Sequence, residues 1–162
     1  MWIFDKLFGR NKQKLKVGVA FAGGGAKGVC HLGIIKAFEE EGIKIDCMAG
    51  TSAGSIVGAA LAAGKKFEEL KKLASSIEAK DIRRNKVFFM PSKTIGVEEL
   101  AKKAIGGDLK FNEHKTEFYC VAVCLNDGKQ KVFSSGNVAK AVSEVVAFLV
   151  SLFLLKSKEE TT

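Results

Sequence analysis

Proline is almost absent from this sequence of 162 residues: Pro91 stands alone, where average usage of about 5% would give roughly eight. No apolar run approaches the roughly 20 residues that span a bilayer, and no secretory signal is evident. The cysteines form no CxxC pair and no Cys/His metal spacing, which predicts reduced thiols, no bound metal and a cytoplasmic protein. These cysteines are Cys30, Cys47, Cys120 and Cys124.

Basic residues outnumber acidic ones by 26 to 18, and the formal net charge is +8. This excess favours anionic partners without choosing between nucleic acid and phospholipid headgroups. Residues 1–16 combine apolar side chains such as Trp2 and Phe4 with a series of basic ones, opposed by Asp5 alone. This basic amphipathic segment is expected either to lie as a short helix on an anionic membrane or to form an ordinary capping helix or frayed terminus.

Short apolar runs alternate with helical patterns over most of the chain, which predicts an α/β domain with a mostly parallel sheet. The Asn-Asp-Gly sequence at 126–128 predicts the turn of a hairpin. Residues 81–96 show no clear period and are expected to form a surface loop. The expected strands are 16–22, 43–49, 116–125 and 130–133, and the expected helices cover 29–38, 55–63, 66–79 and 97–105.

The sequence GTSAG at Gly50–Gly54 matches the G-x-S-x-G pattern of a nucleophile elbow. It lies between a predicted strand and a predicted helix, which is the context that gives this short pattern its meaning. The flanking Gly50 and Gly54, with Thr51 and Ala53 between them, would let the chain reverse sharply. Ser52 is therefore expected at the tip of a tight turn, at the N-terminus of the next helix.

The sequence GGGAKG at Gly23–Gly28 also follows a predicted strand and opens a predicted helix. Consecutive glycines in this position direct backbone N–H groups at one point and form an anion cradle. The tetrahedral intermediate of acyl transfer is such an anion. Because the carboxyl ends of parallel strands share one edge of a sheet, this loop and Ser52 are expected to meet.

The same glycine loop satisfies the G-x-G-x-x-G pattern of a dinucleotide site, with Asp46 as the candidate ribose ligand. In that fold the acidic residue closes the second strand. Here the apolar run continues past Asp46 through Cys47 to Ala49, which disfavours a nucleotide-binding module but leaves it as an alternative.

Two segments resemble the first part of the patatin-like phospholipase domain: VGVAFAGGGAKGVCHLGIIKAFEEEGIKIDCMAGTSAGSIVGAALAAG and CVAVCLNDGKQKVFSSGNVAKAVS. The resemblance covers residues 17–143 and implies a three-layer α/β/α sandwich and a lipid acyl ester hydrolase. It implies a Ser-Asp dyad with no histidine, metal or cofactor, a lipid or other acyl ester substrate, and no nucleic acid. By this resemblance Ser52 is the nucleophile and the oxyanion loop comprises Gly23, Gly24, Gly25, Lys27 and Gly28.

The family's aspartate lies in a D-G-[GA] motif downstream of the hairpin, and this sequence contains no such motif. Asp127 precedes a glycine but is expected to serve the hairpin turn. His31 is expected to be packed within a helix and His114 to lie on a loop. The partial domain is therefore predicted to be inactive, and a non-catalytic membrane- or lipid-binding remnant, peripheral on the membrane, is the alternative function.

Residues 144–162 form an apolar and then charged tail that departs from the family pattern. A single-base deletion near codon 144 would explain the departure, because restoring one base permits a family-like continuation. The nucleotide sequence at that locus tests this hypothesis.

Overall fold

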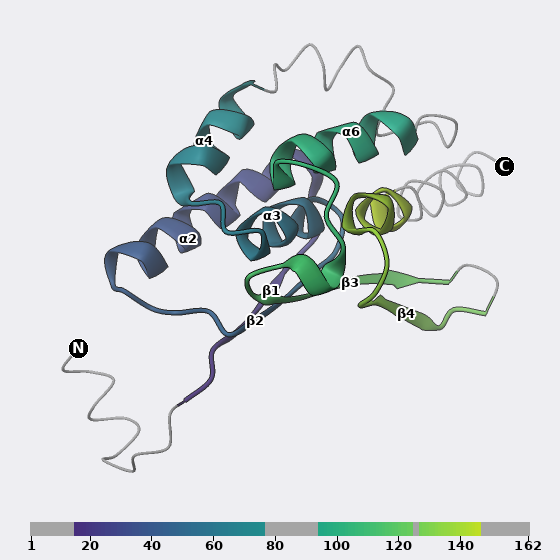
Figure 1. Ribbon diagram of the computed structural model, residues 1–162, viewed down its shortest axis with the longest axis horizontal. Coiled ribbons are helices and arrows are strands. Elements are labelled where there is room, and N and C mark those ends of the chain that lie inside the picture. The colour runs from purple at the N-terminus through teal and green to yellow at the C-terminus, as the bar shows by residue number, and fades with distance from the viewer. Residues whose placement is uncertain (1–14, 77–93, 125–126, 147–162) are drawn as a thin grey trace, which may run out of the picture.

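The computed structural model describes residues 15–76, 94–124 and 127–146 (Figure 1). Within these ranges, β1, β2 and β3 run parallel, and β4 returns antiparallel to β3 as a hairpin. The predicted α/β class with a mostly parallel sheet is thus confirmed. The sheet has the order β1-β2-β3-β4, with β1 at Gly18–Phe21, β2 at Cys47–Gly50, β3 at Glu117–Val123 and β4 at Gln130–Phe133.

Helices occupy the connections between the strands, and residues 138–146 form a further helix after β4. Glycine at position 58 lets α3 lie close to the sheet, because a Cβ added there would come 2.7 Å from the Phe118 ring. In α4, acidic residues in the first turn complement the helix dipole. These helices are η1 at Gly25–Cys30, α2 at His31–Glu40, α3 at Ala53–Ala62, α4 at Phe67–Ser76, α6 at Thr94–Ile105 and η4 at Phe111–Glu113.

Several element boundaries differ from those expected. The second strand begins at Cys47 rather than at residue 43. Of the residues before it, Asp46 alone bonds toward the first strand, and its N–H donates to the Val17 carbonyl over 2.8 Å. The helix at 138–146 was not predicted from the sequence. Its signal is Asn137, whose side-chain oxygen accepts a hydrogen bond from the Lys140 N–H (2.8 Å) as an N-cap does. The expected loop at 81–96 lies outside the described residues up to position 93, and its last three residues are helical instead, because α6 begins at Thr94 rather than at residue 97.

The hydrophobic core lies on one face of the sheet, between the strands and the helices. Phe21, Met48, Phe118 and Cys120 supply its sheet side, and each is at most 4% exposed. Burial raises the pKa of the Cys120 thiol to about 12, so this thiol stays protonated. All four cysteines are free in this structure.

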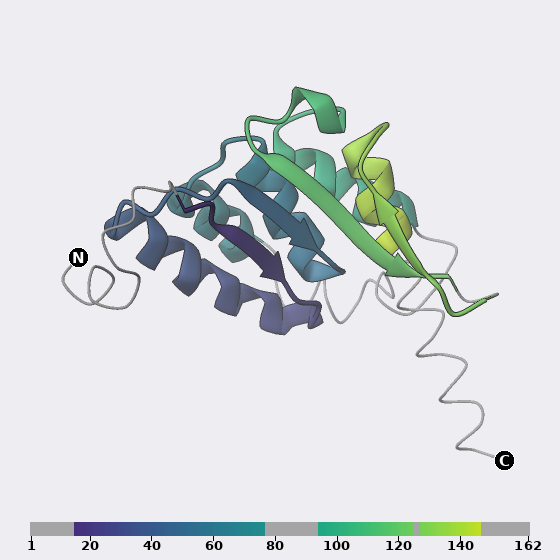
Figure 2. The same cartoon turned by 90° about the horizontal axis from the view of Figure 1, so that it is seen from below.

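The opposite face of the sheet carries no helix from the described part of the chain, and Figure 2 shows the strands in front with the helices behind them. Ala20, Ala49 and Tyr119 stand side by side on this face in the strand register. The described residues therefore supply the sheet and one helical layer of the expected three-layer sandwich. None of their helices combines the length and apolarity needed to cross a bilayer.

Candidate active site

Ser52 occupies a sharp reversal between β2 and α3. The strand ends at Gly50 and the helix begins at Ala53, so two residues turn the chain. Ser52 has φ 50° and ψ −126° and is the one non-glycine residue with positive φ in the ranges that the structure describes. Such a conformation costs about 1–3 kcal/mol and persists only where the surroundings hold it.

Hydrogen bonds and a close approach to β1 hold this reversal in place. The Thr51 N–H donates to the Phe21 carbonyl over 3.2 Å, and the Ser55 hydroxyl donates to the Ser52 carbonyl over 2.5 Å. A Cβ on Gly54 would lie 2.2 Å from the Phe21 oxygen, so only glycine fits there. The second glycine of the G-x-S-x-G pattern is thus required by the crossing of α3 against β1.

The glycine loop lies directly against the elbow. Phe21 pairs with Gly50 in the sheet, so the loop and the elbow leave the same edge. A Cβ on Gly23 would be 3.2 Å from the Ser52 Cβ, and one on Gly28 would be 2.8 Å from the Ala53 Cβ. Within the described part of the chain, the N–H groups of Gly23 and Gly24 form no hydrogen bond. They are available to an anion beside Ser52.

Two hydrogen bonds shape the glycine loop from its ends. The Lys27 N–H donates to the Gly24 carbonyl over 3.1 Å and closes a turn, with the Lys27 side chain exposed. At the base of the loop, Nε2 of His31 lies 2.9 Å from the Ala22 carbonyl, and its ring meets Phe21 edge-on at 5.3 Å. His31 is the first residue of α2, so its ring links the end of β1 to the helix that follows the glycine loop. Sequence reasoning treated it only as a packed helix residue.

The dinucleotide alternative fails on the position of its acidic residue. The Asp46 carboxylate accepts a hydrogen bond from the Val17 N–H over 2.9 Å. Both residues precede their strands, so Asp46 lies at the sheet edge opposite to the glycine loop. A ribose bound beside the loop could not reach this carboxylate.

The described residues contain no acidic group hydrogen-bonded to the Ser52 hydroxyl. Asp127 lies in the β3–β4 turn, where its carboxylate accepts the Lys129 N–H over 3.0 Å and Gly128 has φ +67°. This is the turn role that the sequence predicted. The same ranges contain no cluster of three or more His, Cys, Asp or Glu placed to hold a metal ion.

His114 lies away from the elbow, half-buried between the rings of Phe111 and Phe118, whose centroids are 6.3 and 5.9 Å from its own. Neither ring nitrogen has a hydrogen-bond partner among the described residues. Burial lowers the pKa of His114, with a smaller opposing effect from Glu113. It is a packing residue rather than a site residue.

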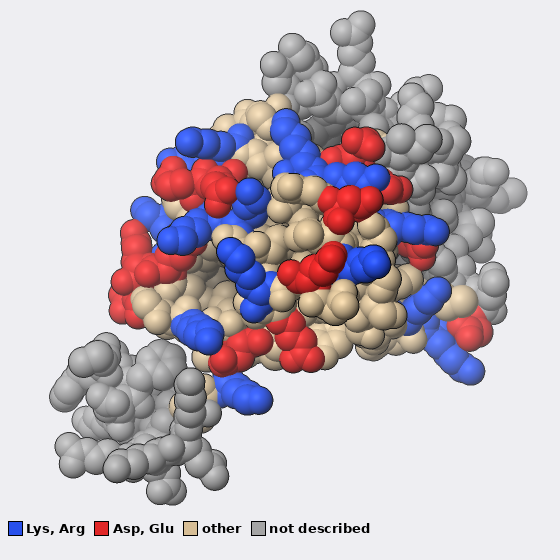
Figure 3. Space-filling view, viewed as in Figure 1, with Lys and Arg blue, Asp and Glu red and all other residues tan. Residues whose placement is uncertain are grey.

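Acidic and basic side chains are intermixed over α2, α4 and α6 on the face shown in Figure 3. One ion pair joins Lys36 to Glu40 within α2, and another joins Lys65, which precedes α4, to Glu69 in the first turn of that helix. This face therefore offers no broad patch of one sign. The basic amphipathic segment and the apolar tail fall almost entirely in residues 1–14 and 147–162, outside the described ranges.

A profile of the patatin-like phospholipase family matches residues 19–148 of the chain. Lysophospholipase NTE1 of Saccharomyces cerevisiae is 32% identical over 128 residues, which are 74% of this chain and 8% of that protein. The same enzyme of Kluyveromyces lactis is 64% identical over 42 residues, 26% of this chain and 3% of that protein. The chain thus spans less than a tenth of these relatives.

Among solved structures, ExoU of the Pseudomonas aeruginosa type III secretion system, crystallised in complex with SpcU, matches with a TM-score of 0.65 and 19% identity. The match covers 82% of this chain and 38% of the ExoU chain. At this identity the likeness concerns the fold.

Proposed function

The chain belongs to the patatin-like phospholipase family, and we propose that it carries the nucleophile and oxyanion loop of a lipid acyl ester hydrolase. Ser52 is the acyl-accepting nucleophile, and the N–H groups of Gly23, Gly24 and Gly25 are the oxyanion donors. The observation that supports this most directly is the contact between the strained Ser52 and the glycine loop, whose Gly23 would bring a Cβ within 3.2 Å of it.

The geometry suits acyl transfer in two steps. The Ser52 oxygen attacks the ester carbonyl carbon, the bond to the alcohol breaks, and the alcohol leaves with the serine proton. Water then attacks the acyl-serine, which releases the carboxylic acid and restores the hydroxyl. In both steps negative charge develops on the carbonyl oxygen, where N–H donors contribute roughly a hundred- to thousandfold each. The N-terminus of α3, at Ala53, adds a favourable partial charge.

The described residues supply no acidic partner to the serine. Asp127-Gly128 is the only Asp-Gly pair in the sequence, and the Asp127 carboxylate serves the hairpin turn. A serine without its base loses on the order of 10⁴ to 10⁶ in turnover, by analogy with dissected serine hydrolases. We therefore expect very slow ester turnover by this chain, with residual reactivity from the oxyanion loop. The substrate class is a lipid ester, in keeping with the lysophospholipase names of the relatives.

Labelling with a fluorophosphonate tests the nucleophile without requiring turnover. We expect the adduct, located by peptide mass spectrometry, to accumulate faster on Ser52 than on the exposed Ser76 of the same chain. Ser52→Ala should abolish that adduct, whereas Ser76→Ala should leave it unchanged. Equal labelling of Ser52 and Ser76 would show that the turn does not activate the serine and would refute the proposal.

A further inference from the structure

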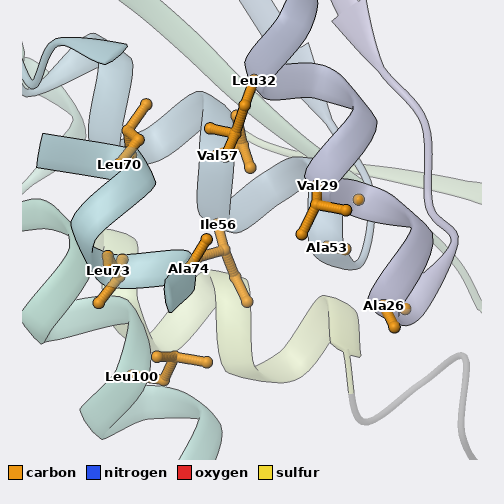
Figure 4. Close-up of a pocket in the computed structure, with 12 residues that line it drawn as sticks. Ala26, Val29, Leu32, Ala53, Ile56, Val57, Leu70, Leu73, Ala74 and Leu100 are labelled. Carbon is orange, nitrogen blue, oxygen red and sulfur yellow. The ribbon is translucent and has the colours of Figure 1, made fainter. Parts of the chain in front are cut away.

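Two hollows border α4, and their linings differ. One is the apolar groove beside the elbow, whose lining residues are all apolar or glycine (Figure 4). The other, of about 340 Å³, lies between α4 and α6 and shares only Leu70 and Leu73 with the groove. Charged side chains line this second hollow, called here the basic hollow: Lys65, Glu69, Lys72 and Lys103. None of its lining residues belongs to the elbow or to the glycine loop.

Helical spacing gathers most of these side chains on one face of α4. Lys65, just before the helix, is followed by Glu69, Lys72 and Ser76 at intervals of three or four residues. Residues at this spacing are neighbours on a helix surface, so the four lie along one stripe. Lys103 lines the basic hollow from α6. Two helices that are distant in the sequence thereby bring three lysines around one depression.

The carboxylate in the basic hollow is already engaged. The Lys65 ammonium donates a hydrogen bond to the Glu69 carboxylate over 2.9 Å, and the Lys66 N–H donates another over 3.1 Å. These two contacts hold the pKa of Glu69 below its usual value. Lys72 and Lys103, by contrast, are exposed and form no ion pair within the described ranges. With three lysines and one glutamate lining it, the basic hollow carries two positive charges in excess.

This charge fits a phosphate monoester, which carries about −1.5 to −2 at pH 7 and offers three acceptor oxygens. A carboxylate or a phosphate diester brings only a single negative charge. Lysine ammonium groups bind phosphate as point charges and donate charge-assisted hydrogen bonds to it. Beneath the lysines the floor is apolar, since Leu70 is 4% and Ala104 is 3% exposed, and low-dielectric walls strengthen the field in a depression.

From this lining we propose that the basic hollow between α4 and α6 binds a phosphate monoester group. Lys72 and Lys103 are its principal ligands, and Lys65 contributes a third positive charge while it remains paired with Glu69. The phosphate belongs either to a free metabolite or to a lipid headgroup, and both present the same dianion. The proposal goes beyond ester hydrolysis and does not depend on Ser52 being the nucleophile.

Isothermal titration calorimetry of the full chain with glycerol 3-phosphate tests the free form of this ligand. We expect saturable binding that is about tenfold or more weaker in Lys72→Gln and in Lys103→Gln, because each change removes a charge-assisted hydrogen bond. Lys44→Gln is the matched control, since it removes the same charge from an exposed residue outside the basic hollow and should leave the affinity unchanged. All three lysines are exposed, so their substitution should leave folding intact.

Sedimentation with vesicles tests the lipid form. Phosphatidic acid presents a phosphate monoester and phosphatidylglycerol a diester, so each is mixed with phosphatidylcholine to equal surface charge. A preference for phosphatidic acid that is lost in Lys72→Gln and Lys103→Gln would support the proposal and assign the phosphate to a headgroup. Binding of glycerol 3-phosphate that depends on the same lysines, without any preference between the vesicles, would support it and assign the phosphate to a free metabolite.

Three results would overturn the proposal. The first is the absence of both glycerol 3-phosphate binding and a preference for phosphatidic acid, which would leave only general attraction to negative surfaces. The second is an equal loss of binding in Lys44→Gln and Lys103→Gln, which would show that net charge alone matters. The third is a loss in Lys27→Gln with none in Lys103→Gln, which would place the phosphate at the glycine loop. Ser52→Ala should leave phosphate binding unchanged even if it abolishes fluorophosphonate labelling, so the two proposals fail separately.

Discussion

The close approach of α3 to β1 makes Gly54 a sensitive position, and Gly54→Ala tests it. The new Cβ would lie 2.2 Å from the Phe21 oxygen, so α3 must retreat from β1 by most of an ångström. Overpacking of this kind costs about 1–3 kcal/mol. Alanine also has a higher helix propensity than glycine, by about 1 kcal/mol in a helix interior. Gly33→Ala is the matched control, because Gly33 is exposed within α2 and a Cβ there meets nothing within 4 Å.

Urea unfolding followed by circular dichroism should therefore rank the two variants clearly. Gly33→Ala should be about 0.5–1 kcal/mol more stable than the original chain. Gly54→Ala should be less stable than Gly33→Ala by about 1–3 kcal/mol, which corresponds to roughly 2–12 °C in Tm for a chain of this size. The retreat of α3 should also slow fluorophosphonate labelling of Ser52. Equal stability of the two variants would refute the claim that β1 and the elbow are in contact at this point.

Three further predictions concern side chains around the core. His31→Phe keeps a ring against Phe21 but removes the hydrogen bond to the Ala22 carbonyl. This change should lower the free energy of unfolding by about 1 kcal/mol and slow the labelling of Ser52. Unchanged labelling would show that the His31 hydrogen bond does not position the glycine loop. Burial lowers the pKa of His114, so the folded chain resists its protonation and should lose stability as pH falls below about 6.5; pH-dependent melting should show this loss diminished in His114→Leu. Iodoacetamide at pH 8 should modify the exposed Cys30 and spare Cys120, whose pKa burial raises to about 12; mass spectrometry showing equal modification would contradict the buried placement of Cys120.

Local patterns were enough to predict the elements that form the candidate site. The apolar runs on either side of the glycine loop and the GTSAG sequence indicated strand, turn and helix in the right order, with errors of a few residues at the ends. The boundary of β2 could not be read locally, because the residues before Cys47 alternate apolar and charged side chains, a pattern that is also typical of a strand. Where pairing begins depends on which residues of β1 and β3 lie opposite.

The helix at 138–146 is an element that was not predicted from the sequence. Its capping residue, Asn137, follows two serines and a glycine, and no element was predicted there from the sequence. The buried Val138 and Val142 give the segment its place in the core, and burial against distant elements cannot be deduced from a short local pattern.

The sequence alone determined the sharp turn at Ser52 and the opening of the glycine loop, because both follow from residues adjacent in the chain that leave few backbone conformations. Tertiary structure decided what each of these local features faces. Only the parallel register of β1 and β2 places Gly23 beside Ser52 and sends Asp46 to the far edge of the sheet. Only helix packing forms an apolar groove from residues as distant as Gly25 and Leu100. The physical reason is that contacts between remote segments depend on the summed burial of the whole chain, which no local sequence pattern specifies.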